Sequence, residues 1–144
     1  VADIGRSQLR YSNGGHPSPI IIRRFRPTVD RIRPENFDPE PALGLIDQFE
    51  YSTCEHPLTI GDRIVAFTDG LPEVDGPGGT QLGEPWLHRM VSENREMTLD
   101  GLFDHLLADA KKQSGNEEFD DDVCLVGVQV YAETKGEQPM LFEV

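Results

Sequence analysis

The sequence predicts an α+β fold formed by a single domain over residues 1–144. Its 144 residues fall within the roughly 100–200 residues of one compact domain, and 37% apolar residues are enough to form a core. Strand-like segments outnumber helix-like ones, and both helix-like segments lie in the second half of the chain. This order favours sheets packed against helices.

The first strand-like segments lie within residues 8–22. Residues 8–13 alternate apolar and polar side chains, as a half-buried strand does, and a Gly-Gly pair ends them. Residues 20–22 are consecutive isoleucines, and this β-branched run favours a strand covered on both faces. We expect the two strands to form a hairpin with its loop at 14–19. The proline-rich residues 26–41 then predict a long loop.

Two further strands and a flap follow. Residues 49–54 alternate again, and residues 60–67 form a dense apolar run after the Gly61-Asp62 turn. The glycine-rich residues 70–83 disfavour both helix and interior strand. We therefore expect a mobile flap there.

The two helices are predicted from apolar residues at helical spacing. The first includes Trp86, a core anchor, and Pro85 must lie in its first turn because proline is tolerated only there. In the second, Thr98 suits the N-cap position and an apolar stripe follows it. An acidic run then leads into a buried strand over 123–130, and residues 140–144 either add a short strand or fray.

The charge of the chain argues against nucleic acid as a partner. Lys and Arg number 13 against 26 acidic residues, and the resulting net charge of −13 repels a phosphate backbone. The charge is also uneven, since residues 1–34 carry a net +5 and residues 35–144 a net −18. The acidic part is therefore the better candidate for binding a metal.

Cysteine content and hydropathy indicate the compartment. The two cysteines lie far apart in the sequence, which favours neither a disulfide framework nor a zinc site. No stretch approaches the ~20 apolar residues that span a bilayer, and the first residues do not resemble a signal peptide. We expect no membrane partner and a cytoplasmic location.

Two acidic segments, each joined to an apolar strand, are the candidate sites. Asp69 follows the strand over 60–67, and Gly70 lets the backbone turn at once. The run Asp120-Asp121-Asp122 opens the strand over 123–130. If these strand ends meet, the carboxylates converge where a divalent cation would offset their repulsion, and oxygen ligands favour Mg²⁺, Mn²⁺ or Ca²⁺. Solvated turn residues are the alternative interpretation.

Four segments, taken in order, resemble the second half of the SpoIIE/RsbU-type serine phosphatases, which belong to the PP2C-like, metal-dependent superfamily. The block Gly-Asp-Arg…Thr-Asp-Gly-Leu-Pro-Glu is the most specific of them. The resemblance implies a PP2C-like β-sandwich flanked by helices in α-β-β-α layers, of which this chain would be an incomplete, C-terminal half. The four segments are residues 11–19, 42–45, 61–73 and 121–126.

The resemblance also implies the ligands. Asp69, in the Thr-Asp-Gly motif, and Asp121, the first member of the late Asp-Asp pair, would bind metal and carry catalysis. Asp122 would support the ligands or cap the turn, and either neighbour of Asp121 remains an alternative ligand. Gly70 would permit the turn, and Glu73 would cap the next turn or hydrogen-bond metal-bound water.

A further supporting segment resembles the Asn-Ala-Gly-His-Pro turn of the family. It contains Asn13 and His16, with Gly14 in place of the usual Ala. Some relatives have an acidic residue at the position of His16, near an accessory metal. For His16 a structural role in the turn is the favoured interpretation.

The implied activity is that of a metal-dependent protein serine/threonine phosphatase. Two Mn²⁺ or Mg²⁺ ions in the complete domain would activate a water molecule that attacks the phosphorus of phosphoserine or phosphothreonine in line. The implied substrate is a phosphorylated anti-anti-sigma-factor-like protein of bacterial sigma factor regulation. An upstream sensor or receiver domain would control the activity.

The motifs of the first half of the family domain are absent from this sequence, and the first residue is Val1 rather than Met. We therefore expect a piece of a longer chain that is weakly active or inactive alone. Its sheets would have exposed edges that invite a homodimer or association with the missing half. Two alternatives remain open. One is a non-catalytic regulatory or protein-binding module of the same fold, and the other is a Ca²⁺-stabilised domain.

Overall fold

The structure, a computed structural model, describes residues 1–3, 5–33 and 39–131. These residues form strands and helices in the order β1-β2-β3-β4-β5-β6-α1-α2-β7. The prediction that strands outnumber helices and that the helices come late is confirmed. The bounds are β1 Ala2–Asp3, β2 Gln8–Tyr11, β3 Ile20–Ile22, β4 Val29–Arg31, β5 Cys54–Pro57, β6 Arg63–Phe67, α1 Gly83–Glu93, α2 Leu99–Ser114 and β7 Leu125–Gln129.

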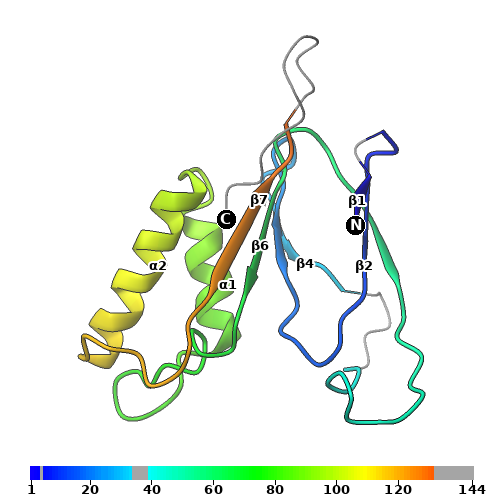
Figure 1. Cartoon of the computed structure of the whole chain (residues 1–144). Coiled ribbons are helices and arrows are strands. Elements are labelled where there is room, and N and C mark those ends of the chain that lie inside the picture. Colours follow the sequence, from blue (N-terminus) through cyan, green and yellow to red (C-terminus); the bar gives the residue numbers. More distant parts are fainter. Residues whose placement is uncertain (4, 34–38, 132–144) are drawn as a thin grey trace.

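The strands form two antiparallel sheets that face each other (Figure 1). The smaller sheet has the strand order β1-β2-β5, and the larger has the order β4-β3-β6-β7. In the larger sheet Ile20 pairs with Val65, and Phe67 pairs with Leu125. The end of β6 therefore lies beside the start of β7.

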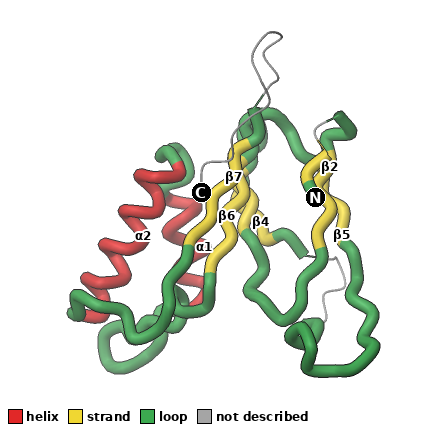
Figure 2. Tube along the Cα trace, in the orientation of Figure 1, coloured by secondary structure: helices red, strands yellow, loops and turns green. Residues whose placement is uncertain are grey.

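Both helices cover the outer face of the larger sheet (Figure 2). The isoleucine run of β3 explains this arrangement, because alternate side chains of a strand point to opposite faces. Ile20 and Ile22 point to the helices, where they meet Trp86 and Leu87 of α1 in the main core. Leu102 and Leu106 are among the residues through which α2 completes that core.

A second core lies between the two sheets. Ile21 of β3, on the opposite face from its neighbours, packs with Ile32 and Leu58, and Leu9 and Tyr11 of β2 complete the contact. All three isoleucines of β3 are buried, as predicted for a strand covered on both faces. The described residues thus form α, β and β layers in an α+β fold.

Local sequence signals set the helix ends. The side chain of Thr98 accepts a hydrogen bond from the Gly101 amide at 3.2 Å, as expected of an N-cap. Gly115 ends α2 at φ 74°, a conformation that glycine adopts without the penalty of a Cβ atom. Pro85 lies in the first turn of α1, and Trp86 is buried with its indole N–H donated to Asp109. The predictions for both helices are confirmed.

The turn before β6 is held by a buried carboxylate. Asp62 is 1% exposed and accepts hydrogen bonds from the amides of Thr59 and Arg24, each at 2.9 Å. It also pairs with the Arg23 guanidinium at 2.9 Å. The next residue, Arg63, donates to backbone carbonyls after α1. The Gly-Asp-Arg segment is therefore a structural anchor between the β3–β4 hairpin, β6 and α1.

Three sequence predictions are wrong. Residues 8–13 and 20–22 do not form a hairpin, because β2 and β3 belong to different sheets. The predicted loop over 26–41 contains strand β4, which pairs with β3. The predicted strand over 49–54 is displaced, since β5 begins only at Cys54.

Other predictions fall partly outside the described residues. The tail prediction over 140–144 lies outside them, as does part of the loop predicted over 26–41. Among the residues that are described, no helix is long and apolar enough to cross a membrane.

Candidate functional site

The ends of β6 and β7 bring the two acidic segments together. Beyond the last paired residues of the strands, the Thr68 amide donates to the Cys124 carbonyl at 3.1 Å. The Thr68 hydroxyl donates to the Asp122 carbonyl at 2.8 Å and accepts from the Cys124 amide at 2.9 Å. This side chain extends the pairing of the strands past their ends. Asp69 therefore follows directly after a contact with the backbone of Asp122.

Gly70 makes this approach sterically feasible. A Cβ atom built on Gly70 would lie 2.6 Å from the Asp122 carbonyl oxygen and 3.4 Å from the carbonyl carbon of Asp121. Contacts of about 3.4–4 Å are ordinary for such an atom. Only a residue without a side chain fits here, which gives the Asp-Gly pair of the sequence a physical reason. Gly70 is not among the glycines with a positive φ, so its observed role is the close approach to Asp122, and its role in permitting the turn stays a prediction.

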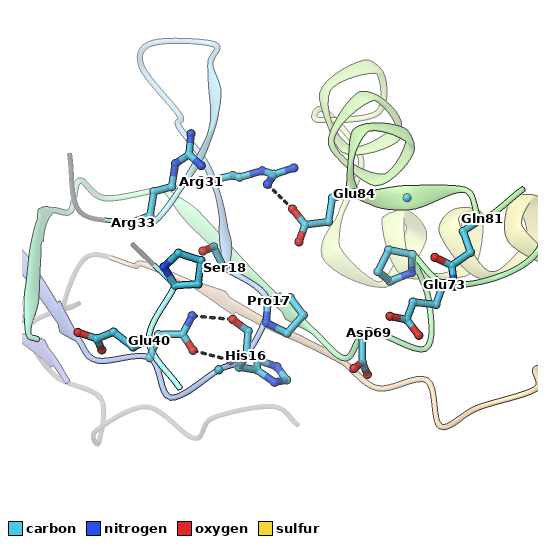
Figure 3. A pocket seen from close by; sticks show the side chains of 15 residues that line it. His16, Pro17, Ser18, Arg31, Arg33, Glu40, Asp69, Glu73, Gln81 and Glu84 are labelled. Carbon is cyan, nitrogen blue, oxygen red and sulfur yellow. Dashed lines mark hydrogen bonds and ion pairs between the residues drawn. The ribbon is translucent and has the colours of Figure 1, made fainter. Parts of the chain in front are cut away.

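Asp69 lines a cavity of about 520 Å³ on the surface (Figure 3). Glu73, Asn13 and His16, which the resemblance singled out, line the same cavity. In Figure 3 Asp69 and Glu73 lie on one side of it, and Glu40 on the opposite side. The cavity thus collects residues from β6, from the loop after β2 and from the segment before α1.

Asp121 lines a neighbouring cavity of about 210 Å³, together with Asp120 and Gly70. Glu73 and Gln81 line both cavities, so the two cavities adjoin at these residues. The structure therefore brings the two acidic segments side by side through their backbones, and places the two carboxylates on adjoining cavities.

The turn around Asn13 is closed by its own side chain. The Asn13 amide group donates to the His16 carbonyl at 2.6 Å, and its carbonyl oxygen accepts from the His16 amide at 2.9 Å. A Cβ atom on Gly14 would lie 2.7 Å from the Leu43 side chain, and one on Gly15 would lie 2.7 Å from the backbone of Ala42. The Gly-Gly pair thus lets the loop at 42–45 pack against this turn.

The glycine-rich segment before α1 is anchored at several points. Leu71 is fully buried in the main core, and the Glu73 amide donates to the Asp69 carbonyl at 2.9 Å. Asp75 and Gln81 form an isolated β-bridge. Glu73 therefore closes the turn that begins at Asp69, and the residues most open to solvent are those between the two halves of the bridge.

Arginines of the β4 region are functional candidates that the sequence interpretation missed. Arg31 and Arg33 line the same cavity as Asp69, and Arg31 forms an ion pair with Glu84 at the start of α1. The signal was the alternation of Arg31 and Arg33 with the apolar Ile32, which is 1% exposed. Flanking prolines obscured it by favouring a loop.

The carboxylates of this site suit a hard cation, but within the described part of the chain they are not grouped as a set of three around one point. Asp69, Glu73 and Asp121 offer the oxygen donors that Mg²⁺ and Mn²⁺ prefer. Over residues 1–3, 5–33 and 39–131, however, no three His, Cys, Asp or Glu side chains are grouped closely enough to bind a metal ion. The described residues therefore do not form a complete metal centre.

Similar structures show the same fold. The chain superposes on the phosphatase domain of SpoIIE from Bacillus subtilis with a TM-score of 0.68 and 17% identity, covering 95% of this chain and 57% of that one. For the SiaA-PP2C domain of Pseudomonas aeruginosa the TM-score is 0.67 at 19% identity, covering 86% and 47%. For the RsbU and RsbW domains of Rv1364c from Mycobacterium tuberculosis the TM-score is 0.63 at 23% identity, and the match covers 92% of this chain and 35% of that one.

The chain thus spans about half the length, or less, of these solved structures. Among curated proteins, none matches it. The sequence profile of the family described as Stage II sporulation protein E (SpoIIE) matches residues 1–131. The predicted α+β fold and the resemblance to SpoIIE/RsbU-type PP2C-like domains are confirmed, and this chain belongs to the SpoIIE family.

Proposed function

We propose that residues 1–144 are the C-terminal portion of one PP2C-like phosphatase domain, which hydrolyses phosphoserine or phosphothreonine on a regulatory protein. The observation that carries this proposal is the junction of β6 and β7. There Thr68 and Gly70 hold the Thr-Asp-Gly turn against the backbone of the late Asp pair. Membership of the SpoIIE family supports the same activity.

In this proposal Asp69 and Asp121 each contribute a carboxylate to a site for Mn²⁺ or Mg²⁺. No group of three candidate ligands occurs among the described residues, so in this proposal the other ligands come from the first part of the phosphatase domain. A divalent cation in such a site supplies an activated water near neutral pH. The complete domain would bind two ions, and this chain by itself would be weakly active or inactive.

The residues of this chain have distinct tasks. Thr68 fixes the distance between the two strand ends, so that both acidic segments move as one unit. Glu73 stands between the cavities of Asp69 and Asp121, where its carboxylate can orient water. Asn13 and His16 form a closed turn on the rim, which favours a structural role for His16.

The partners follow from the family. We propose a phosphorylated anti-anti-sigma-factor-like protein as substrate, and control by a sensor or receiver domain in the same protein. The solved structure that pairs RsbU and RsbW domains in one chain supports a place in such a signalling system. A cytoplasmic location and a homodimer through the free edges of the sheets complete the proposal.

The test is hydrolysis of a phosphoserine peptide by the full-length natural protein, with and without added Mn²⁺. We expect Mn²⁺-dependent phosphate release that Asp69→Asn reduces by at least about 100-fold, because a lost metal ligand removes most of the catalytic effect. Asp104→Asn, the same change of charge at an exposed position on α2, serves as the control and should keep its activity. Equal rates in wild type and Asp69→Asn would refute the proposal and favour a non-catalytic binding module.

A further inference from the structure

We propose that Arg31 and Arg33 form an anion subsite that selects phosphoprotein segments carrying acidic side chains beside the phosphorylated residue. The inference rests on the proposed function, because it assigns the recognition of that same substrate. It concerns binding, however, and does not require that a metal or any hydrolysis be present.

Position is the first argument. Both arginines line the 520 Å³ cavity that also contains Asp69, and both line an adjoining cavity of about 640 Å³ with Pro85 and His88 of α1. The two cavities therefore share both arginines in their linings, and we refer to the two cavities together as the groove. Figure 3 shows the arginines on one side of the first cavity, away from Asp69 and Glu73.

The strand geometry holds the arginines in this groove. Ile32, between them, is 1% exposed and buried in the core between the sheets, so Arg31, the last residue of β4, points to the opposite face. That face is bordered by the first turn of α1, where Glu84 pairs with Arg31. The burial of Ile32 therefore determines on which face of the sheet Arg31 lies. Arg33 lies past the end of the strand and lines the same two cavities.

The groove contains more acidic side chains than arginines, Asp30 of the second cavity included, so an acidic side chain of a ligand would be accepted at the arginine end and repelled elsewhere. The chain has a net charge of −13, and Asp69, Glu73, Glu40 and Glu84 all line the cavity. A phosphoprotein segment would be repelled there unless cations received part of its charge. Arginine binds carboxylate oxygens through two parallel N–H groups, which makes it suited to this task.

Glu84 would act as a competitor within the site. Its ion pair with Arg31 is partly exposed, with side-chain exposures of 28% for Arg31 and 38% for Glu84. Such exposed pairs are weak, so an incoming carboxylate can replace Glu84 at low cost. Glu84→Gln should therefore strengthen binding of an acidic segment, while loss of Arg31 should weaken it.

The test compares two fluorescein-labelled phosphoserine peptides that differ only in flanking residues, Asp in one and Asn in the other. Binding is measured by fluorescence anisotropy with the full-length natural protein in the absence of metal. We expect the wild type to prefer the Asp peptide, and Arg31→Ala or Arg33→Ala to reduce that preference about fivefold each. Glu84→Gln should increase affinity for the Asp peptide, and Arg31→Lys should retain part of the preference.

Arg26→Ala is the matched control. Arg26 is exposed in the loop that joins β3 to β4, at the other end of this hairpin from Arg31. Arg26→Ala removes the same charge as Arg31→Ala without altering the groove, so it should leave the preference for the Asp peptide unchanged. An equal loss in Arg26→Ala would overturn the proposal, because the effect would then come from overall charge. An unchanged preference in folded Arg31→Ala and Arg33→Ala proteins would also overturn it.

Hydrolysis of p-nitrophenyl phosphate separates this inference from the proposed function. This small substrate has no flanking residues, so Arg31→Ala and Arg33→Ala should raise the KM for the Asp peptide more than the KM for p-nitrophenyl phosphate. An equal rise in both KM values would assign the arginines to the phosphoryl group and overturn the inference. If instead Asp69→Asn left hydrolysis intact while the arginine variants lost peptide preference, the proposed function would fail and the subsite would stand.

Discussion

Replacing Gly70 by alanine tests whether the two acidic segments are truly held together. The new Cβ atom would lie 2.6 Å from the Asp122 carbonyl oxygen, whereas an ordinary contact begins at 3.4 Å. The strand ends must therefore separate by roughly 0.8 Å, the difference between these two distances. Backbone rather than a flexible side chain opposes the new methyl group, so little local relaxation is available.

The expected cost follows from the size of this displacement. Inserting a methyl group into a well-packed site lowers the free energy of unfolding by about 1–3 kcal/mol. Alanine in place of glycine raises it by about 0.4–1 kcal/mol, because alanine restricts the unfolded chain. A net loss of about 1–2 kcal/mol in the free energy of unfolding is expected. In a chain of this size that loss lowers the Tm by roughly 3–8 °C.

Urea unfolding followed by circular dichroism measures this loss. Gly5→Ala is the matched control, because Gly5 also lies in a turn and a Cβ there would lie 3.5 Å from the nearest atom, an oxygen of Asp3. Gly5→Ala should be neutral or slightly stabilising. If Gly70→Ala were as stable as Gly5→Ala, the close approach of Gly70 to Asp122 would be refuted, and with it the shared location of Asp69 and Asp121.

Three further predictions concern polar groups near the cores. Thr68→Val should lower the free energy of unfolding in urea by about 1–3 kcal/mol, because valine removes both hydrogen bonds of the hydroxyl. Thr68→Ser keeps the hydroxyl and should lower it much less. Asp62→Ala should lower the free energy of unfolding by about 3 kcal/mol or more in the same assay, since it leaves the partly buried Arg23 guanidinium without its carboxylate partner and two amides without their acceptor. Burial raises the pKa of Tyr11 and of Cys54, so the unfolded chain loses these protons first and stability should fall as the pH rises above about 9. Tyr11→Phe should flatten that fall, because phenylalanine has no hydroxyl to titrate; an unchanged pH profile would contradict this.

The core strands and helices were predictable because their signals are local. The isoleucine run of β3 faces both cores, so its continuous apolarity corresponds to burial on both faces. Thr98 and Gly115 mark the ends of α2 through hydrogen bonding and backbone conformation that depend only on nearby residues. Such signals need no knowledge of which strands pair.

Strand pairing was not predictable in the same way. Residues 12–19 cross from one sheet to the other, and nothing in their composition distinguishes this connection from a hairpin loop. The sequence around β4 contains Pro27 and Pro34, which favour a loop although Ile32 is buried between the sheets. Both outcomes, the separate sheets of β2 and β3 and the presence of strand β4, depend on contacts with residues that lie far apart in the sequence.

The candidate site was likewise predictable only in those parts that have a local signal. The turn at Asp69 and the acidic entrance to β7 are visible in the sequence because each adjoins an apolar strand. Their approach depends on the pairing of Phe67 with Leu125 and on the Thr68 hydroxyl, which only the structure reveals. The arginines of the β4 region reach the same cavity through that tertiary arrangement, so sequence patterns gave no link between them and Asp69.

The most direct test of the central claim is a double-mutant cycle in Mn²⁺ affinity, measured by isothermal titration calorimetry on the full-length natural protein. The variants are Asp69→Asn, Asp121→Asn and the two combined. If both carboxylates serve one metal centre, each single change should lower the affinity at least about tenfold, and the double change should add little to either. Fully additive losses, or an unchanged affinity in Asp121→Asn, would contradict a shared centre.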